Sequence, residues 1–331
     1  MNKIYRHFFL PEKRKLKSGG PLGMGWMGFM APELVQLAYA LFTAIVIFFT
    51  WTNLEAPQQL MWQRLTYVSG IIALWVVYKL WPCRFVLMLR FLYLLYTLAY
   101  WYPDTYEINH QFGCLDHLFV NYEQDMFGMQ PALRFSEIFS SPVVSELMYF
   151  GYLSYYLFFV ATIFYVFFKH YDQVERVAYI IMAGFFICYV IFLFLPVVGP
   201  QYYYLAAGVE EIAHGTFPDV GNYFREHTEA ITMPGWNGGI FYHLCELAHQ
   251  TGERPTAAFP SSHVAIATLV MVMLLRMRLW KNLLVLAIPY VFLCLSTVYI
   301  MAHYAIDAIA GLFFGIILFF ILGGMKLSKL K

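Results

Sequence analysis

Charged residues are scarce in this sequence, and their scarcity excludes several classes of protein. Asp, Glu, Lys and Arg together supply 12% of the 331 residues, whereas an ordinary soluble domain contains about 25%. The formal net charge is only +1, so the chain lacks the positive field that attracts nucleic acid, and we expect no nucleic-acid partner. Hydrophobic residues supply 61%, and this excess predicts an all-α polytopic membrane protein embedded in a lipid bilayer.

Cysteine is also rare, and the N-terminus lacks a signal-like run. The five cysteines include no Cys-x-x-Cys pair, so we expect no metal site and no cofactor. The first residues are polar and basic, and we expect no cleavable secretory signal. Cys114 and Cys245 fall in two long polar segments, where an oxidising compartment would allow a disulfide between them; two free thiols are the alternative.

Long apolar runs are the most abundant feature of the chain. Crossing a bilayer takes roughly 20 apolar residues. We predict about eight transmembrane helices, over 33–52, 65–81, 84–102, 146–168, 177–198, 259–277, 282–300 and 304–323. The chain then divides into a basic N-terminal segment (1–31), N-terminal transmembrane helices (32–102), an outer loop (103–145) and a transmembrane core (146–325) that contains a second outer loop (199–258).

The basic residues are distributed unevenly between the two sides of these helices. With eight helices and a cytosolic N-terminus, most lysines and arginines fall on the cytosolic side, in agreement with the positive-inside rule. The outer side keeps Arg64, Arg134, Arg225 and Arg254, and Arg90, inside a span, is expected to snorkel to the surface. We therefore expect both termini in the cytosol. The two long loops would face the periplasm of a bacterial inner membrane or an equivalent lumen.

Two polar clusters interrupt the apolar C-terminal third. The first, Pro260-Ser261-Ser262-His263, begins the helix predicted at 259–277. A serine at this position caps a helix, and the free N–H groups of the first turn form a ready anion site. His263 follows within that turn and could face the same anion. Capping alone is the alternative explanation for the serines.

The second cluster contains His303 and Asp307, where the last two predicted helices meet. These residues are four apart, so on one helix they would share a face. Asp307 could then accept the Nδ1 proton of His303 and leave Nε2 free as a nucleophile. A structural His–Asp hydrogen bond is the alternative, but ionisable residues in membrane segments favour a functional site.

The two clusters resemble motifs of the type 2 phosphatidic acid phosphatase superfamily. Its second motif is Pro-Ser-Gly-His, and here Pro260-Ser261-Ser262-His263 stands in that pattern. Its third motif is Ser-Arg, five residues, His, three residues, Asp, and here Ser296-Thr297 precedes His303 and Asp307 at the same spacing. Its first motif, Lys, six residues, Arg-Pro, is not found ahead of these two.

The departures from the superfamily pattern indicate which group within the superfamily this sequence resembles. The Ser-Thr form of the third motif, together with the Pro-rich turn at 196–202, is similar to the fungal inositol phosphorylceramide synthase group and its bacterial relatives. The resemblance extends over roughly 176–323. Residues 1–145 resemble no family that we can name.

This resemblance implies a six-helix phosphatase-like catalytic core and a two-step, metal-independent phosphoryl transfer. His303 would attack phosphorus and form a phosphohistidine, Asp307 would orient it, and His263 would act first as acid and then as base. Backbone N–H groups near Ser261 and Ser262 would hold phosphate oxygens. The substrate would be a lipid phosphoester whose headgroup, such as phosphoinositol, moves to a ceramide or diacylglycerol. With water as acceptor, the same residues would make a lipid phosphate phosphatase.

The arginine of the third motif is missing, because Thr297 occupies its position. Phosphoryl transfer needs positive charge at the phosphate oxygens, so another basic residue must replace it. Arg134, Arg225 and Arg254 are the candidates, and each alone could equally be a solvated loop charge. Further hydrogen-bond donors on the outer side are Gln201, Tyr202 and Tyr203.

The other outer histidines are interpreted as ordinary loop residues. They are His110, His117, His214, His227, His243 and His249. A transporter or lipid-binding protein that uses Asp307 and the motif histidines as a proton relay is a further alternative. It predicts polar residues towards the middle of several helices, whereas here they gather at one end.

Overall fold

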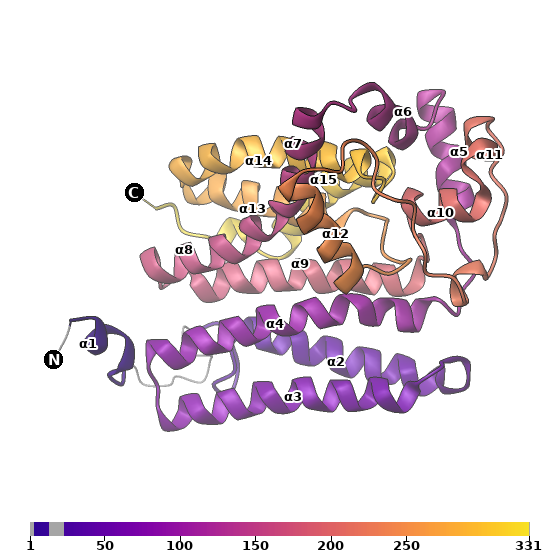
Figure 1. The fold of residues 1–331 in the computed structure, drawn as a ribbon. Coiled ribbons are helices and arrows are strands. Elements are labelled where there is room, and N and C mark those ends of the chain that lie inside the picture. The colour runs from indigo at the N-terminus through magenta and orange to yellow at the C-terminus, as the bar shows by residue number, and fades with distance from the viewer. Residues whose placement is uncertain (1–2, 13–22, 331) are drawn as a thin grey trace.

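Helices form the framework of the protein. The computed structural model describes residues 3–12 and 23–330, and the only β pairing within these ranges is one isolated bridge between Trp26 and Phe29. Long helices run side by side, and short helices gather at one end of the bundle (Figure 1). The predicted all-α class is confirmed. Its physical reason is that a helix satisfies its own backbone N–H and C=O groups in a medium without water.

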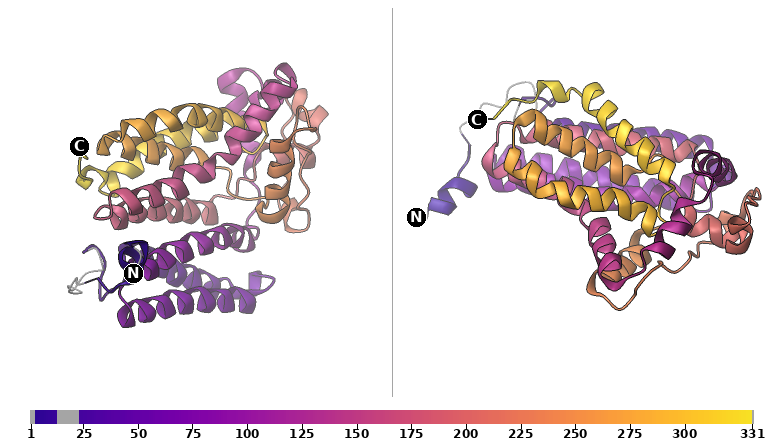
Figure 2. Two further views of the ribbon diagram at one scale, coloured as in Figure 1. Left: turned by 60° about the vertical axis from the view of Figure 1, so that its left-hand side comes forward. Right: turned by 90° about the horizontal axis from the view of Figure 1, so that it is seen from above.

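The N-terminal helices form a layer of their own. This layer lies below the other long helices in Figure 1 and stays separate from them in the left view of Figure 2. The helices of this part are α1 (Lys3–Phe9), α2 (Ala31–Phe49), η1 (Trp51–Asn53), α3 (Pro57–Leu80) and α4 (Arg84–Asn109). In the second layer, α9 (Val174–Phe194) packs against both α2 and α4 and so joins the two layers.

The second layer contains both polar clusters. Its helices are α7 (Pro142–Leu153), η2 (Leu157–Ala161), α8 (Thr162–Lys169), α9 (Val174–Phe194), α13 (Ser262–Met277), α14 (Trp280–Tyr299), α15 (Ala305–Ile321) and η4 (Gly324–Lys326). The segment η2 is a single π-helical turn between α7 and α8.

Short helices, here called the cap, cover one end of this layer. They are α5 (Asp116–Phe127), α6 (Pro131–Ile138), α10 (Pro200–Ala207), α11 (Val209–Ala213), η3 (Tyr223–Arg225) and α12 (Ile240–Gly252). The cap is made from the two segments predicted as outer loops, 103–145 and 199–258. Figure 1 shows both chain ends at the opposite end of the bundle from α5, α6, α10 and α11.

Of the eight predicted spans, five or six are supported by the length and apolar composition of the described helices. All eight predicted segments are largely helical, but only α2, α3, α4, α9 and α14 among the described helices are long and apolar enough to cross a membrane unaided. A sixth span forms if α7 and the segment Leu157–Lys169, which meet at a 48° bend, count as one. The apolar helices α13 and α15 have 16 and 17 residues. Each begins later than predicted, because the residues ahead of it form the turns that hold the polar clusters.

Two glycines bring α15 close to α13. A Cβ at Gly311 would lie 2.6 Å from the backbone oxygen of Ser261, and one at Gly315 would collide with the backbone oxygen of Ala265. Small residues four apart allow such an approach between membrane helices. The approach places the N-terminus of α15 beside that of α13, where Ser261 N–H donates to the backbone oxygen of Asp307 at 3.1 Å.

The N-terminal layer contains two buried ion pairs. The Arg64 guanidinium donates to both carboxylate oxygens of Asp104, with a shortest distance of 2.6 Å, and Arg90 forms a similar pair with Glu33. Arg64 is therefore not an exposed outer charge, and Arg90 does not snorkel, because each guanidinium finds a carboxylate inside the layer. Pairing offsets the high cost of an isolated charge in this environment.

The two cysteines of the long segments are free thiols. The Cys114 thiol donates to Asp116 Oδ2 at 3.2 Å, and the Cys245 thiol donates to the backbone oxygen of Tyr149 at 3.5 Å. Each sulfur lies in a different hydrophobic cluster. The disulfide considered from the sequence is therefore not formed in this structure.

Candidate active site

The two motif histidines meet at the cap end of the second layer. His263 lies in the first turn of α13, which Ser261 caps by accepting the N–H of Val264. His303 lies in the turn between α14 and α15. His303 Nε2 is 3.4 Å from His263 Nδ1, so residues 40 positions apart in sequence form a direct contact.

The other ring nitrogen of His303 determines its tautomer. Its Nδ1 is 2.8 Å from the backbone oxygen of Ala258. Because a carbonyl oxygen can only accept, Nδ1 carries the proton and Nε2 carries the lone pair. His263 Nδ1–H therefore donates to His303 Nε2, and the lone pair of the predicted nucleophile points towards the predicted acid.

The expected helical relation between His303 and Asp307 is wrong. Helix α15 begins at Ala305, so His303 precedes it, and Asp307 Oδ2 accepts the backbone N–H of Tyr304 at 2.8 Å. The same oxygen is 3.8 Å from His303 Nδ1, beyond a hydrogen bond. The carbonyl of Ala258 takes the acceptor role that the spacing assigned to Asp307. Asp307 instead shapes the turn that holds His303.

Burial sets the protonation state of His303. Its exposure is 4%, and desolvation lowers its pKa from 6.5 to about 4, although the Ala258 carbonyl and the charge of Glu253 act in the opposite direction. The imidazole is therefore neutral at physiological pH. A neutral imidazole with a free Nε2 is the form that can act as a nucleophile.

Two buried carboxylates from α5 hold the turn around His303. Asp116 accepts the backbone N–H of Gly199 at 2.8 Å and the hydroxyl of Tyr304 at 2.9 Å. Glu123 Oε1 accepts the backbone N–H of Ala305 at 2.5 Å, at the start of α15. Burial raises the pKa of Glu123 to about 8, and the nearby charge of Asp307 adds to this effect.

Sequence reasoning missed both α5 carboxylates, because 103–145 was treated as a loop. A signal was present in the sequence. Asp116 and Glu123 are seven residues apart, which places them on one face of a helix, two turns from each other.

The Pro-rich turn at 196–202 connects the two histidine segments. The backbone oxygen of Val197 accepts the N–H of Ala258, and the N–H of Gln201 donates to Met301, both at 2.8 Å. Gly199, at φ +94°, fits between these contacts. The turn therefore holds the backbone on both sides of the histidine pair.

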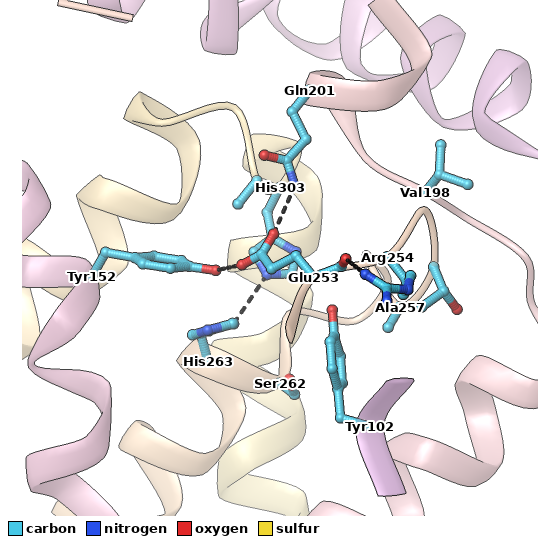
Figure 3. Close-up of a pocket in the computed structure, with 12 residues that line it drawn as sticks. Tyr102, Tyr152, Val198, Gln201, Glu253, Arg254, Ala257, Ser262, His263 and His303 are labelled. Carbon is cyan, nitrogen blue, oxygen red and sulfur yellow. Dashed lines mark hydrogen bonds between the residues drawn. The ribbon is translucent and has the colours of Figure 1, made fainter. Parts of the chain in front are cut away.

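A pocket opens beside the histidine pair. Its lining residues are Tyr102, Tyr152, Val198, Gln201, Glu253, Arg254, Thr256, Ala257, Ser262, His263, Ala302 and His303 (Figure 3). Aromatic rings restrict one wall, because Tyr152 stacks on the His263 ring with centroids 4.7 Å apart and Tyr155 lies at 4.2 Å. These rings fix the plane of the imidazole and reduce the room for water.

Of the three arginines proposed to replace the missing one, Arg254 lines the pocket. Arg134 is 60% exposed and pairs with Glu137 on α6. Arg225 donates to the backbone oxygens of His110 and Gln111 and lines a different pocket. The position of the missing arginine, Thr297, is buried in α14.

The proposed hydrogen-bond donors also separate into two groups. Gln201 and Ser262 line the pocket. Ser261 is used structurally, since its hydroxyl caps α13 and its N–H donates to Asp307. Tyr202 and Tyr203 are buried outside the lining, and the Tyr203 hydroxyl donates to the backbone oxygen of Pro218.

Glu253 is a central pocket residue that the sequence interpretation did not assign. Its carboxylate accepts the Tyr152 hydroxyl and Gln201 Nε2–H, the latter at 2.8 Å (Figure 3). His249 Nε2 lies 3.3 Å from the same carboxylate. Burial raises the pKa of Glu253, but His249 and the hydrogen bonds from Tyr152 and Gln201 outweigh burial, so the pKa lies below its usual value. His249 is therefore not an ordinary loop residue. Its spacing of four from Glu253, at the end of α12, was the available signal.

The fold and the site together define a class: an all-helical membrane protein with two contacting histidines at one end of its bundle. A comparison with protein families gives the family. The model described as PAP2 superfamily matches residues 118–321, which is more than half of the chain, and the chain belongs to this superfamily. Searches of curated proteins and of solved structures found no match. The matched region contains His263, His303 and Asp307, and it begins inside α5, earlier than the resemblance at 176–323.

Membership of this superfamily supports an enzyme that acts on phosphoesters, with lipid phosphatase or phosphotransferase activity. The apolar helices support an integral membrane location. Together they favour an enzyme over the proton-relay transporter considered from the sequence. Within the described residues, no group of three or more His, Cys, Asp or Glu side chains is placed to hold a metal ion.

Proposed function

We propose that the protein is an integral membrane lipid phosphotransferase that moves a phosphorylated headgroup, such as phosphoinositol, between lipids through a phosphohistidine. The observation that carries this proposal is the histidine pair. His303 has its proton on Nδ1, held by Ala258, and directs Nε2 at His263 from 3.4 Å. This arrangement supplies a nucleophile and an acid–base group at one point, as covalent phosphoryl transfer requires.

In the first step, His303 Nε2 attacks phosphorus while the bond from phosphorus to the leaving oxygen breaks. A phosphate anion bound beside His263 favours the protonated form of this ring, and protonated His263 gives its proton to the leaving alkoxide, so that an alcohol such as diacylglycerol departs. The positive charge that develops on the His303 ring is stabilised through its Nδ1–H bond to the Ala258 carbonyl. Acid–base catalysis of this kind contributes typically about 10²–10⁴-fold.

In the second step, neutral His263 accepts the proton of the acceptor hydroxyl. The acceptor oxygen attacks phosphorus, the nitrogen–phosphorus bond breaks, and His303 returns to its neutral form. A ceramide or diacylglycerol hydroxyl makes this step a headgroup transfer, and water makes it a hydrolysis. The burial of His303 and the ring of Tyr152 against His263 favour an acceptor other than water, since both reduce solvent access.

The phosphate charge needs donors, and the pocket offers two kinds. Ser262 lies in the first turn of α13, where backbone N–H groups and the helix dipole favour an anion. Arg254 is the arginine of the proposed set that lines the pocket, and we assign it the place of the missing motif arginine.

We also propose that the site faces the outer side of the membrane. The cap lies at the opposite end from both termini (Figure 1), and the basic residues concentrate towards the terminal side. Single cysteines introduced at exposed positions in 199–258 should react with an impermeant maleimide in intact cells. For a protein in a bacterial inner membrane, labelling only after permeabilisation of that membrane would place the site in the cytosol.

The enzymatic proposal is tested with purified protein in mixed micelles. A phospholipid labelled in its headgroup is incubated with and without ceramide or diacylglycerol, and we expect the label to appear on the acceptor lipid. Water-soluble phosphate or headgroup as the only labelled product, even with an acceptor present, would refute transfer in favour of the phosphatase alternative.

The histidine mechanism is tested by His303→Ala, with His214→Ala on the exposed end of α11 as matched control. We expect His303→Ala to abolish labelled product and His214→Ala to match the wild type. Full activity in His303→Ala would overturn the mechanism.

A further inference from the structure

The pocket beside the histidine pair contains hydrogen-bond acceptors that a phosphate group cannot satisfy. Glu253 presents a carboxylate, and Gln201 presents a side-chain oxygen. A phosphate diester or monoester at neutral pH offers mainly acceptor oxygens and negative charge. Its negative charge is repelled by the Glu253 carboxylate, and its acceptor oxygens cannot donate a hydrogen bond to Gln201 Oε1.

The orientation of the Gln201 amide is determined by its neighbour. Nε2 donates to Glu253 Oε2 at 2.8 Å, because the carboxylate can only accept, so Oε1 is the remaining atom. Gln201 is 3% exposed, and among the described residues no donor lies within hydrogen-bond reach of this Oε1. A buried acceptor without a donor is unfavourable, because it has lost its hydrogen bond to water and gained no other. A ligand that brings an O–H group would recover this cost.

Positive and negative groups occupy different parts of the same pocket. Arg254 donates to the backbone oxygen of Glu253 at 2.9 Å and not to its carboxylate. In Figure 3 the carboxylate of Glu253 lies between Tyr152 and Gln201, whereas Arg254 lies towards Ala257. The donor side therefore suits phosphate, and the acceptor side suits a neutral group rich in hydroxyls.

We propose that Glu253 and Gln201 form a subsite that binds hydroxyl groups of the substrate, in the polyol headgroup of the donor lipid or on the acceptor lipid. This inference rests on the proposed phosphotransferase function. In the structure the Tyr152 hydroxyl and the Gln201 amide occupy the carboxylate. The Tyr152 ring also stacks on His263, so a hydroxyl bound here lies next to the acid–base residue. The subsite binds and positions the hydroxyl, and His263 handles its proton.

The test compares Glu253→Gln with the wild type on substrates that differ only in hydroxyl content. Phosphatidylinositol and phosphatidic acid with identical acyl chains are the donors, and water or a short-chain fluorescent ceramide is the acceptor. A hydrogen bond to a charged group contributes about 1.5–3 kcal/mol, so kcat/KM for the hydroxyl-bearing partner should fall about 10- to 150-fold. Glu253 also lines the pocket and its charge acts on His303, so hydrolysis of phosphatidic acid falls as well. The result that decides is the ratio of kcat/KM for the hydroxyl-bearing partner to kcat/KM for phosphatidic acid with water, which should decrease clearly.

Glu146→Gln is the matched control. Glu146, on α7, accepts the N–H groups of Phe241 and Tyr242 at the start of α12, so it holds the same helix without lining the pocket. Glu146→Gln should leave the ratio of the kcat/KM values for these substrates unchanged. This result would show that a displaced α12 does not by itself cause the loss expected for Glu253→Gln. Gln201→Leu, which removes the unpaired oxygen, should lower the same rate as Glu253→Gln.

Each pattern of results decides the proposal. A loss confined to phosphatidylinositol assigns the subsite to the headgroup, and a loss confined to ceramide transfer assigns it to the acceptor. Equal losses on all substrates, or a wild type that accepts phosphatidic acid and water alone, would overturn the hydroxyl subsite while leaving the histidine chemistry intact. A wild type inactive on every lipid phosphoester would instead overturn the proposed function.

Discussion

Replacing Gly199 by alanine should disable the enzyme through the backbone around the histidine pair. A Cβ at this position would lie 2.6 Å from the backbone oxygen of Ala302 and 3.4 Å from Cβ of Ala258. Ala302 directly precedes His303, and the Ala258 carbonyl accepts its Nδ1–H. The added methyl group therefore presses on both segments that position the nucleophile, without touching a catalytic side chain.

The expected effect has two parts. Gly199 has φ +94° and ψ 164°, a region that is essentially restricted to glycine and costs other residues about 1–3 kcal/mol of stability. Relief of the 2.6 Å contact requires the Ala302 carbonyl to move. A displacement of about 1 Å at an active site can cost about 10²-fold in rate. We therefore expect kcat/KM to fall about 100-fold, equivalent to about 2.7 kcal/mol of transition-state stabilisation.

Gly208→Ala separates the backbone strain from the displacement of the Ala302 carbonyl. Gly208 has a similar φ of +92° and lies at the other end of α10. A Cβ there would meet the Glu211 side chain at ordinary contact distances, 3.5 Å to Cγ and 3.9 Å to Cβ. Both variants should lose stability in thermal unfolding, but only Gly199→Ala should lose turnover of a labelled phospholipid at temperatures where both remain folded. Wild-type kcat/KM in folded Gly199→Ala would refute the claim that this turn positions His303. An equal loss in Gly208→Ala would attribute the effect to backbone strain alone.

Three further predictions concern protonation, charge and the N-terminal layer. Because burial lowers the pKa of His303 to about 4, its neutral, nucleophilic form persists as the pH falls. The value of kcat/KM should therefore decline on the acid side near pH 4. A decline centred near pH 6.5 would contradict the buried, neutral imidazole. Arg254→Ala should lower kcat/KM about 10- to 100-fold by removing a charge-assisted contact to phosphate, with partial recovery in Arg254→Lys, whereas unchanged kinetics would mean that phosphate binds elsewhere. Arg64→Ala should lower the free energy of unfolding by about 3–5 kcal/mol, because it leaves Asp104 buried and unpaired. Arg64→Met combined with Asp104→Leu should lose less stability, because neither charge remains. Equal losses of stability in thermal unfolding would show that the pair is not coupled.

The long helices were predictable because their cause is local. A run of apolar residues forms a helix in a bilayer whatever its neighbours, since the helix satisfies its own backbone. The cap was not predictable in the same way. Its helices are short, and glycines and prolines such as Gly208 and Pro218 separate them. They are stabilised by packing rather than by their own length, since α12 packs on α7, α6 on α14 and α5 on α15.

The buried charges of the N-terminal layer show the same limit. Sequence placed Arg64 outside and let Arg90 reach the surface, because each arginine was considered alone. The structure pairs them with Asp104 and Glu33, 40 and 57 positions away. Which carboxylate faces which guanidinium depends on the helix packing, and no spacing within one helix reveals it.

The sequence by itself determined the helical membrane class, the two motifs and the identity of the histidines, because composition and short spacings carry that information. The tertiary structure decided how these residues act. It placed His303 ahead of α15, directed its Nδ1–H at the backbone oxygen of Ala258 instead of Asp307, and added Glu253, Asp116 and Glu123 to the site. The physical reason is that a hydrogen bond requires atoms within about 3 Å, and for residues 40 or more positions apart only the packing of helices brings them within that distance.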